Sequence, residues 1–403
     1  MHVDLIGTGG GSPGSMILES AELLKNADLI IGAKRLLESL PQEYCSNRVA
    51  EIYAAKIMDI IESSGCENIC VAFSGDSGFY SGATGMIPLL QEKGMDFTVH
   101  SGLSSIQLFA SALKRPWQDW NLFSAHGTDI DPVSCVMQGK DAFFLTGGKL
   151  TCEVILTILR DAGLGQLKAA VGENLSYPNQ RVIEGTVESL LNEKIDSLSV
   201  LLIEKAPAGP RSLPGVDDEL YIRGKVPITK RDVRAVVLSH MKIDPESIIW
   251  DVGAGTGGIS VELALAACRG KVYAVETNEE GIELIKKNRE KFCRFNIVPV
   301  PGMAPEALKD LPAPDRVFIG GSKKNMMAIV QTVHEKNPSA LVCITAIALE
   351  SLFEAMEALD KFGYSVNVTQ ISSAGAKVVG SYHMMMAENP IYILTGEKDT
   401  CTE

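Results

Sequence analysis

The sequence has no paired cysteine motif, no long apolar segment and little positive charge. Its nine cysteines are scattered, and the nearest two, Cys66 and Cys70, lie four residues apart, so no C-x-x-C motif occurs. We therefore expect neither disulfides nor a bound metal such as zinc, which suits a reducing cytoplasm. No uncharged run approaches the roughly 18 residues of a membrane span, and the start, Met1 to Ile6, lacks the regions of a signal peptide. These absences predict a cytoplasmic protein that does not associate with a membrane.

Acidic residues outnumber basic ones. The chain has 50 Asp and Glu against 37 Lys and Arg, which gives a formal net charge of -13. Recognition of nucleic acid depends on Lys and Arg that neutralise phosphates, so this balance argues against a nucleic-acid partner. At 403 residues, the chain is long enough for two or three domains, each with its own core. Length and composition together agree with two soluble enzyme domains.

The chain divides near residues 205–215. Three prolines and two glycines occur within these eleven residues, and such a composition continues neither a helix nor a central strand. We therefore expect an N-terminal domain over 1–205, a linker over 206–215 and a C-terminal domain over 216–403. Both halves alternate strands with helices, which predicts the α/β class.

The expected elements follow the alternation of apolar and polar residues. In the N-terminal half, strands are expected at 3–6, 28–31, 69–73 and 142–145, and helices at 16–26 and 151–162. In the C-terminal half, strands are expected near 248–252, 272–276, 316–319, 341–345 and 391–394, and helices at 258–268, 279–291, 323–335 and 350–362. The C-terminal half is thus a plain succession of βα units.

The most informative segment runs from Ile249 to Gly258, where an apolar strand passes through Asp251 into glycines that open a helix. A second apolar run ends on Glu276, twenty-three residues after Gly253. In a βαβ unit, this arrangement places bare backbone N–H groups and a helix N-terminus at one end of a ligand. It places a carboxylate that accepts from both ribose hydroxyls at the other end. The pattern predicts an adenosine pocket.

Two adenosine cofactors fit this pocket. Gly253, Gly255 and Gly258 satisfy the dinucleotide spacing G-x-G-x-x-G, which suits a nicotinamide cofactor. The longer pattern D-x-G-x-G-x-G, which adds Asp251 and Gly257, resembles the first motif of the Rossmann-like methyltransferases, which bind S-adenosylmethionine. We favour the methyl donor and keep an NAD-dependent oxidoreductase as the alternative.

The N-terminal half carries its own series of glycine loops at predicted strand ends. Open α/β sheets bind ligands outside the carboxyl ends of their strands, where glycine lets a backbone approach closely and Ser, Asp and Asn supply hydrogen bonds. Several such loops, when they converge, predict a second pocket. The loops lie at 7–13, 73–80, 101–105, 125–127, 145–148 and 171–176.

This series of loops, in this order, resembles the tetrapyrrole methylase family over residues 1–203. The segments S-G-D-S-G-F-Y-S-G and G-E-N-L-S-Y are most similar to the branch that methylates precorrins at carbon 5. Residues 214–322 resemble the decarboxylating carbon-15 methyltransferases of the same pathway through P-G-V-D-D-E-L-Y, V-P-I-T-K-R-D-V-R, the glycine loop, G-M-A-P-E-A-L and V-F-I-G-G-S. Together, the two halves resemble the fused precorrin C(5,15)-methyltransferases of corrin (cobalamin) biosynthesis. The resemblance implies a tetrapyrrole methylase fold followed by a Rossmann-like methyltransferase fold, with a small tetrapyrrole as substrate.

The resemblance also implies two S-adenosylmethionine sites per chain. The first glycine loop has Gly10 where the family usually has proline, and without that ring the loop is less preorganised. In the N-terminal domain, the implied cofactor residues are Gly75, Asp76, Ser77, Ser104 and Ser105, together with Gly9 and Gly11 of the first loop. In the C-terminal domain, they are Thr229, Gly253, Ala254, Gly255, Thr256, Gly257, Glu276 and Ala304.

The expected chemistry needs few catalytic groups from the protein. A precorrin meso carbon is part of an electron-rich enamine and attacks a sulfonium methyl directly, so the enzyme chiefly holds the reactants in line and excludes water. Loss of carbon dioxide from the ring-C acetate arm is plausible because the conjugated ring accepts the electrons. The sequence identifies no catalytic residue for either step.

Candidate substrate contacts come from loop position and charge. His126 and Glu173 are polar residues of N-terminal loops, and each either contacts the substrate or makes an ordinary loop hydrogen bond. Arg223, Lys225 and Arg231, together with Lys230 and Arg234, belong to a cationic stretch before the second cofactor loop. They either bind carboxylates of the substrate or form a solvated helix face.

A third function stays open at this point beside the methyltransferase and the oxidoreductase. A non-catalytic tetrapyrrole carrier or sensor would use a similar ring site, but it has no need of two adenosine pockets. We expect a homo-oligomer. A cobalt-containing and a metal-free substrate are both open, as is the order of the two methylations.

Overall fold

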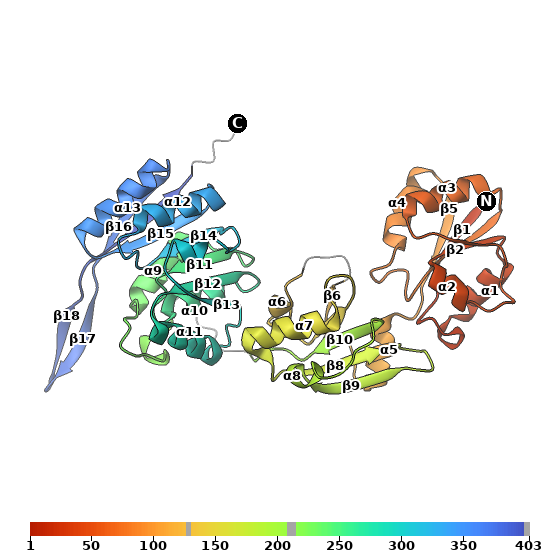
Figure 1. The fold of residues 1–403 in the computed structure, drawn as a ribbon, viewed down its shortest axis with the longest axis horizontal. Coiled ribbons are helices and arrows are strands. Elements are labelled where there is room, and N and C mark those ends of the chain that lie inside the picture. The colour runs from red at the N-terminus through yellow and green to blue at the C-terminus, as the bar shows by residue number, and fades with distance from the viewer. Residues whose placement is uncertain (126–129, 208–214, 399–403) are drawn as a thin grey trace. The chain divides into compact units, whose positions relative to one another are not determined.

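The computed structural model describes residues 1–125, 130–207 and 215–398 (Figure 1). The candidate residue His126 therefore lies outside the described residues. The chain forms two compact units. Unit 1 comprises Met1–Ile130, Lys140–Arg160 and Gly165–Glu204, and unit 2 comprises Asp131–Gly139, Asp161–Leu164 and Lys205–Glu403.

The first sheet of unit 1 is parallel. Its strand order is β3-β2-β4-β1-β5, and each of its strand pairs runs parallel. Val3, Leu5 and Ile6 are fully buried, as expected of a parallel strand that is covered on both faces. The strands are β1 (His2–Gly7), β2 (Leu29–Gly32), β3 (Arg48–Ala50), β4 (Asn68–Phe73) and β5 (Asp96–His100).

The second sheet of unit 1 is mixed. Its order is β6-β7-β10-β8-β9, in which β6 and β7 are parallel and the other pairs are antiparallel. Phe143 of β7 is fully buried and stacks on Trp120 with ring centroids 6.2 Å apart. The strands are β6 (Asn121–Ser124), β7 (Ala142–Leu145), β8 (Lys168–Glu173), β9 (Arg181–Thr186) and β10 (Ser199–Ile203).

Two helices in this half of the chain, α5 and α7, begin at a side-chain cap close after a predicted loop. Ser104 caps α5 with a capping box to Gln107, and Thr151 caps α7, which satisfies otherwise unpaired backbone N–H groups. The α-helices are α1 (Leu18–Asn26), α2 (Lys34–Ser39), α3 (Ala54–Ser64), α4 (Ala83–Glu92), α5 (Ser105–Leu113), α6 (Pro132–Val136), α7 (Cys152–Leu159) and α8 (Val187–Leu190), with a 3₁₀ turn at Pro13–Ser15 and a π-helical turn at Arg160–Leu164.

Unit 2 is built on a seven-stranded sheet with order β13-β12-β11-β14-β15-β19-β16. The first five strands are parallel, whereas β19 runs antiparallel to both of its neighbours. β11 lies where the strand order reverses, between β12 and β14, and open α/β sheets bind ligands at this switch point. The strands are β11 (Ile248–Val252), β12 (Lys271–Glu276), β13 (Ile297–Pro301), β14 (Arg316–Ile319), β15 (Leu341–Ala346), β16 (Ser365–Ile371) and β19 (Ile391–Glu397).

Among the helices that follow β11, α10 is deeply buried, with every residue from Gly258 to Ala264 buried. Within the described residues, no helix combines the length and the apolar character needed to cross a membrane. The helices are α9 (Arg231–Met241), α10 (Gly258–Ala266), α11 (Glu279–Lys291), α12 (Met326–Lys336) and α13 (Leu349–Lys361), with 3₁₀ turns at Asp218–Leu220 and Glu306–Leu308.

The α/β prediction is confirmed, and the elements expected in the C-terminal half lie within three residues of their observed bounds. The alternation of apolar and polar residues did not predict β13, which contains Pro299 and Pro301. Proline removes a backbone donor and is confined to sheet edges, and β13 is indeed an edge strand of its sheet.

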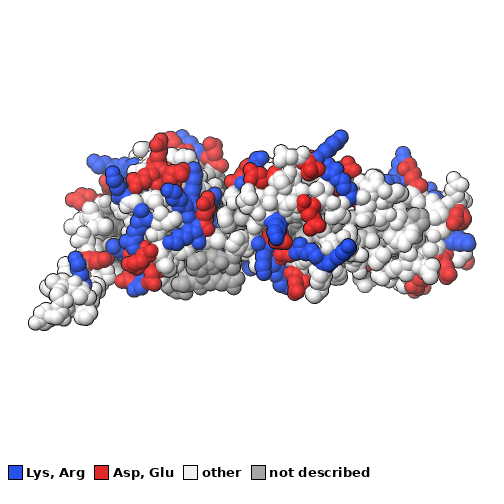
Figure 2. Space-filling view, turned by 90° about the horizontal axis from the view of Figure 1, so that it is seen from below, with Lys and Arg blue, Asp and Glu red and all other residues white. Residues whose placement is uncertain are grey.

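A long hairpin projects from unit 2 and was also missed (Figure 1). Its strands are β17 (Ala374–Val379) and β18 (Tyr382–Ala387), and all of their residues are exposed. Gly380 and Ser381 form the two-residue turn, with Gly380 at φ +63°, and a glycine-led pair between two apolar runs is a hairpin signal. Figure 2 shows the hairpin almost without charge, while acidic and basic side chains are interspersed over the rest of the visible face.

A buried ion-pair network joins α9 to α10. Arg234 is fully buried, and it donates from Nε to Glu262 at 2.6 Å and from Nη1 to Asp218 at 2.6 Å. Glu262 is also fully buried and accepts from the N–H groups of Gly215 and Val216 at 2.8 and 3.2 Å. Buried charges are tolerated when they are paired and hydrogen-bonded in this way. This arginine of the cationic stretch is therefore part of the core.

We predict that Arg234→Met lowers the free energy of unfolding of unit 2 by about 3–5 kcal/mol, because it leaves a buried carboxylate without its cation. The control is Arg231→Met, whose side chain is 52% exposed and pairs with Asp217 at the surface; its cost is less than about 1 kcal/mol. Chemical denaturation, read by hydrogen exchange of the strands of unit 2, measures both. Equal losses in the two variants would contradict the prediction.

Candidate functional site

The glycine loop after β11 has a backbone that only glycine adopts without strain. Gly253, Gly255 and Gly257 have φ values of +77°, +58° and +78°, in the left-handed region where a Cβ is unfavourable. A Cβ on Gly253 would also lie 2.8 Å from the backbone N of Gly321. The loop therefore turns tightly between β11 and α10, where the N–H groups of Gly253 and Ala254 both donate to the carbonyl of Val275 at 3.0 Å.

Glu276, at the end of β12, holds this loop. Its Oε2 accepts from the N–H of Gly255 at 2.8 Å, and its Oε1 accepts from the N–H groups of Thr277 and Asn278, each at 2.8 Å. The hydroxyl of Thr277 also donates to Oε1, at 3.2 Å, whereas Oε2 has one donor, so the acceptor position left on Glu276 is at Oε2.

A cavity of about 920 Å³ lies at this end of the sheet. This volume is within the usual range of ligand sites. Gly257 is absent from the wall: it is the N-cap of α10, and a Cβ there would lie 3.1 Å from Ile285 Cγ1. The predicted cofactor residues that do line the cavity are Thr229, Gly253, Ala254, Gly255, Thr256, Glu276 and Ala304.

Two polar atoms at the glycine loop fit a bound polar ligand. Thr256 Oγ1 and Asp251 Oδ1 are buried and have no hydrogen-bond partner, and such groups are costly unless something satisfies them. Burial, together with the charge of Glu276, raises the pKa of Asp251 to about 7. Thr256 also lines the cavity. The glycine cradle, the carboxylate and the unsatisfied hydroxyl together match what an adenosine-bearing methyl donor needs.

Of the charged residues in the cavity wall, Lys230 belongs to the predicted cationic stretch, whereas sequence reasoning did not select Lys323 and Glu388. Lys230, Lys323 and Glu388 line the cavity, and Lys230 Nζ lies 4.0 Å from Glu388. The signal for Lys323 was its position directly after the segment V-F-I-G-G-S, which had itself been recognised. Glu388 carried no signal, because it follows the hairpin that the sequence analysis missed.

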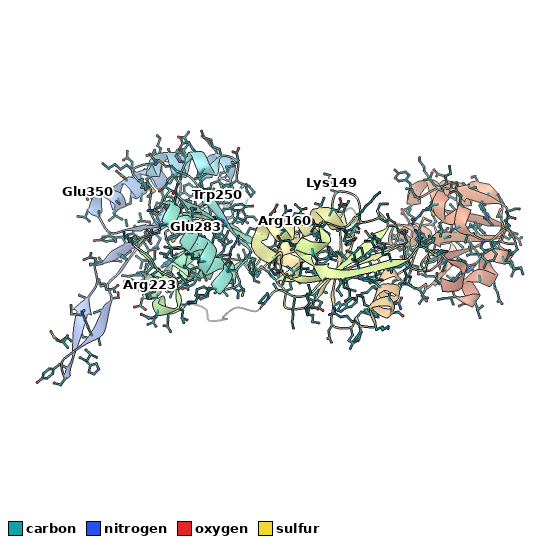
Figure 3. The ribbon with its side chains drawn as sticks, turned by 60° about the horizontal axis from the view of Figure 1, so that its bottom comes forward. Lys149, Arg160, Arg223, Trp250, Glu283 and Glu350 are labelled. Carbon is teal, nitrogen blue, oxygen red and sulfur yellow. The ribbon has the colours of Figure 1, made fainter. Side chains whose placement is uncertain are left out.

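Three cations of the predicted stretch lie away from the cavity. These are Arg223, Lys225 and Arg231, which are not among its lining residues. Arg231 pairs with Asp217 at 2.6 Å, and Arg223 pairs with Glu219 at 3.7 Å. Figure 3 shows Arg223 toward the outside of unit 2, where its side chain is 39% exposed. Lys225 contributes its backbone N–H to Glu280 at 2.9 Å. Their surroundings resemble the solvated face that was the alternative interpretation.

In unit 1, the loops after β1, β4 and β5 converge. Gly9 and Gly75 exchange backbone hydrogen bonds of 3.0 and 2.7 Å between the first two loops. Asp76 Oδ1 accepts from the N–H of Gly102 in the third loop at 3.0 Å. A Cβ on Gly7 would lie within 3 Å of two of these loops, so close packing here depends on glycine.

These loops border a cavity of about 230 Å³. This volume is below the usual range of ligand sites, about 300–1,000 Å³. Gly10 lines this cavity and donates its N–H to Ser15 Oγ at 3.0 Å, a bond that proline cannot make. The predicted residues in the wall are Gly9, Gly75, Asp76, Ser104 and Ser105, and Tyr80, Thr146 and Tyr177 are additional ones.

Three other predicted residues of unit 1 lie outside this wall. Ser77 is buried and donates to the carbonyl of His100 at 2.8 Å. Gly11 has φ +100°, and a Cβ there would collide with the hydroxyl of Tyr177. Glu173 is 2% exposed and accepts from the N–H of Asp196 at 2.8 Å. The structure thus gives all three a role in shaping loops.

Comparison with known families finds two matches that divide the chain. The profile of the tetrapyrrole (corrin/porphyrin) methylases matches residues 2–191, and that of the precorrin methyltransferase domain matches residues 220–398. The two matches do not overlap.

Curated relatives agree with the second match. A "Probable cobalt-precorrin-6B C(15)-methyltransferase (decarboxylating)" from Pyrobaculum calidifontis is 42% identical over 189 residues, which cover 46% of this chain and 97% of the relative. The protein of the same description from Sulfurisphaera tokodaii is 35% identical, covering 46% and 98%. Among solved structures, the precorrin-6y C5,15-methyltransferase from Geobacter metallireducens is 36% identical, with TM-score 0.45, and covers 47% of this chain and 98% of that one.

Proposed function

Because this chain belongs to the precorrin methyltransferases, S-adenosylmethionine-dependent enzymes of cobalamin biosynthesis, we propose that it is bifunctional. Unit 2 methylates carbon 15 of a late precorrin and removes carbon dioxide from the ring-C acetate arm. Unit 1 methylates carbon 5 of the same ring system. The observation that carries the proposal is the 920 Å³ cavity, where the glycine loop and Glu276 meet.

The residues of unit 2 position the reactants. Bound S-adenosylmethionine supplies a methyl group on a positively charged sulfur. Gly253 and Gly255 let the backbone approach the donor closely, Glu276 accepts from its ribose hydroxyls, and Thr256 offers an unsatisfied hydroxyl. Methyl transfer to an electron-rich carbon needs alignment more than proton transfer, which agrees with a wall that contains no histidine or cysteine.

The apolar part of the same wall suits loss of carbon dioxide. Ile228, Met303 and Ile347 line the cavity with the polar groups described above. Poor solvation of a carboxylate favours its conversion to neutral carbon dioxide, and exclusion of water limits unwanted protonation. The chain contributes shape and polarity here, while the conjugated ring accepts the electrons.

We assign the units to domains at the positions that the sequence predicted. The carbon-5 domain spans 1–205, the linker 206–215 and the carbon-15 domain 216–403. The two profile matches, at 2–191 and 220–398, support this division. The NAD-dependent oxidoreductase and the non-catalytic carrier are not favoured, because both matched families are methyltransferases.

The substrate is a tetrapyrrole rimmed by carboxylates. The archaeal relatives are described as acting on cobalt-precorrin-6B, whereas the Geobacter protein is described by precorrin-6y. We propose a late precorrin for this chain, and the cobalt form and the metal-free form are compared in the assay below. His126, Glu173, Arg223, Lys225 and Arg231 remain proposals for substrate contact.

We also propose that the chain forms a homo-oligomer through the hairpin of β17 and β18. An isolated two-stranded hairpin is marginally stable in water, and this one exposes Val378, Tyr382 and the three methionines Met384 to Met386. Both of its faces carry apolar side chains, and Lys377 is the single Lys, Arg, Asp or Glu in its strands. A second copy with the same surface offers matching apolar area.

The function is tested by mass spectrometry of products made from a late precorrin, with and without cobalt, and S-adenosylmethionine. We expect two methyl additions and one loss of carbon dioxide. Gly255→Val should abolish carbon-15 methylation and decarboxylation and leave carbon-5 methylation, while Asp76→Ala should have the converse effect. Each variant receives the substrate that suits its intact unit, so that reaction order does not mask activity. Decarboxylation by a folded Gly255→Val protein would refute the assignment.

Calorimetric titration tests the number of donor sites. We expect close to two S-adenosylmethionine molecules per wild-type chain and close to one for Gly255→Val, because the left-handed strain and a Cβ 3.1 Å from the carbonyl of Pro227 close the second site. Gly363→Val is the control, since Gly363 has the same left-handed backbone, φ +68°, away from the cavity wall. A firm value of one for the wild type contradicts two sites.

The oligomer is tested by light scattering. The double variant Met384→Lys with Met386→Lys places two charges on the hairpin and should dissociate the assembly into smaller species. Leu18→Lys is the control, because Leu18 is 83% exposed on α1, outside the hairpin, and it should keep the wild-type mass. A monomeric wild type, or an unchanged mass in the double variant, shows the hairpin proposal to be wrong.

A further inference from the structure

The loop that follows β14 brings a lysine into the wall of the larger cavity. β14 pairs in parallel with β11, so the loops at their carboxyl ends lie at the same edge of the sheet. Lys323 lies on this loop and lines the cavity together with Gly253, Gly255 and Glu276. Its neighbour Lys324 does not line it.

The backbone of this loop is unfavourable for the residues that it carries. Lys323 and Lys324 have φ values of +45° and +68°, a region in which residues with a side chain cost about 1–3 kcal/mol. The loop is tied to the opposite segment, because Asn325 Nδ2 donates to the carbonyl of Ala304 at 3.1 Å. Glycine or asparagine would form such a turn with less backbone strain. A strained lysine whose side chain lines the cavity therefore points to a role in ligand binding.

The ammonium of Lys323 is held by a neutral group. Its Nζ donates to Thr277 Oγ1, and that hydroxyl donates in turn to Glu276 Oε1 at 3.2 Å. Among the described residues, no carboxylate lies within 4.0 Å of Lys323 Nζ, whereas Lys230 in the same wall lies 4.0 Å from Glu388. Lys323 therefore presents a positive charge to the cavity that the protein itself does not pair.

We propose that Lys323 anchors a carboxylate arm of the tetrapyrrole substrate, which makes it a residue that determines substrate specificity. This inference rests on the proposed function of unit 2. A carboxylate that replaces the Thr277 hydroxyl forms a charge-assisted hydrogen bond, which is stronger than the neutral one that it displaces. The contact becomes stronger still when the ring covers the cavity and excludes water.

The anchored arm is one that the product keeps. An ammonium stabilises the charged form of a carboxylate, so it would oppose loss of carbon dioxide from the arm that it holds. Anchoring a different arm fixes the ring without this penalty. The interaction is then equal in the ground state and the transition state, and such uniform binding lowers KM without raising kcat.

The test compares Lys323→Met with Lys324→Met in the full chain. The two positions are adjacent and share the left-handed backbone, so the substitutions cost similar strain and differ in whether the lost charge faces the cavity. For the late precorrin with free carboxylates, we expect Lys323→Met to raise KM about ten- to a hundredfold, with little change in kcat. Lys324→Met should retain the wild-type KM, and Lys323→Arg should recover most of the loss.

A second experiment uses the precorrin with its acetate and propionate groups converted to methyl esters. Wild type and Lys323→Met should bind this neutral compound equally, as measured by its inhibition of the reaction. The KM of the wild type for the free acid should rise with ionic strength, and that of Lys323→Met should rise less.

The outcomes distinguish a failure of the proposed function from a failure of the role assigned to Lys323. An inactive wild-type chain refutes the proposed function itself. An active wild type with Lys323→Met and Lys324→Met equal in KM, or with the ester discriminated as strongly as the acid, overturns the role of Lys323 and leaves the proposed function standing. A fall in kcat at unchanged KM also overturns it.

Discussion

The hydrogen bond from the N–H of Gly255 to Glu276 is the contact on which the larger cavity depends. It ties the glycine loop of β11 to the end of β12, and it requires backbone angles that only glycine adopts at low cost. With the loop held in this way, its backbone and the carboxylate of Glu276 line the same cavity. The cavity wall, the unsatisfied Thr256 hydroxyl and the link through Thr277 to Lys323 all follow from this arrangement.

The buried pair of Arg234 and Glu262 stabilises the helix that follows the glycine loop. It fastens α9 and the segment before it to α10, the helix that the glycine loop opens. That segment contributes Thr229 and Lys230 to the cavity wall. A charge that the sequence offered as a substrate contact is thus used for packing, and the cation that faces the cavity without a carboxylate partner comes from the loop after β14. In both cases, tertiary neighbours decide the role of a basic residue.

The two units build their candidate sites on different frameworks. Unit 2 uses one loop with left-handed glycines, an acid at the end of the next strand and a cavity of about 920 Å³. Unit 1 uses three converging loops, linked by Asp76 and by Gly9 with Gly75, around about 230 Å³. The cavity of unit 1 is smaller than most ligand sites, whereas that of unit 2 is within their usual range.

The sequence alone was enough to predict the α/β class, nine of the strands and helices in the C-terminal half, and the glycine loop with Glu276 at the second cavity. It did so because these features depend on local periodicity and on glycines whose spacing reflects a required backbone conformation. Only the tertiary structure decided which charges face the cavity, since Arg231 and Lys323 are alike in sequence and differ in their neighbours. It also decided the proline-containing edge strand and the exposed hairpin, because strand pairing and the lack of a covering element are relations between distant segments.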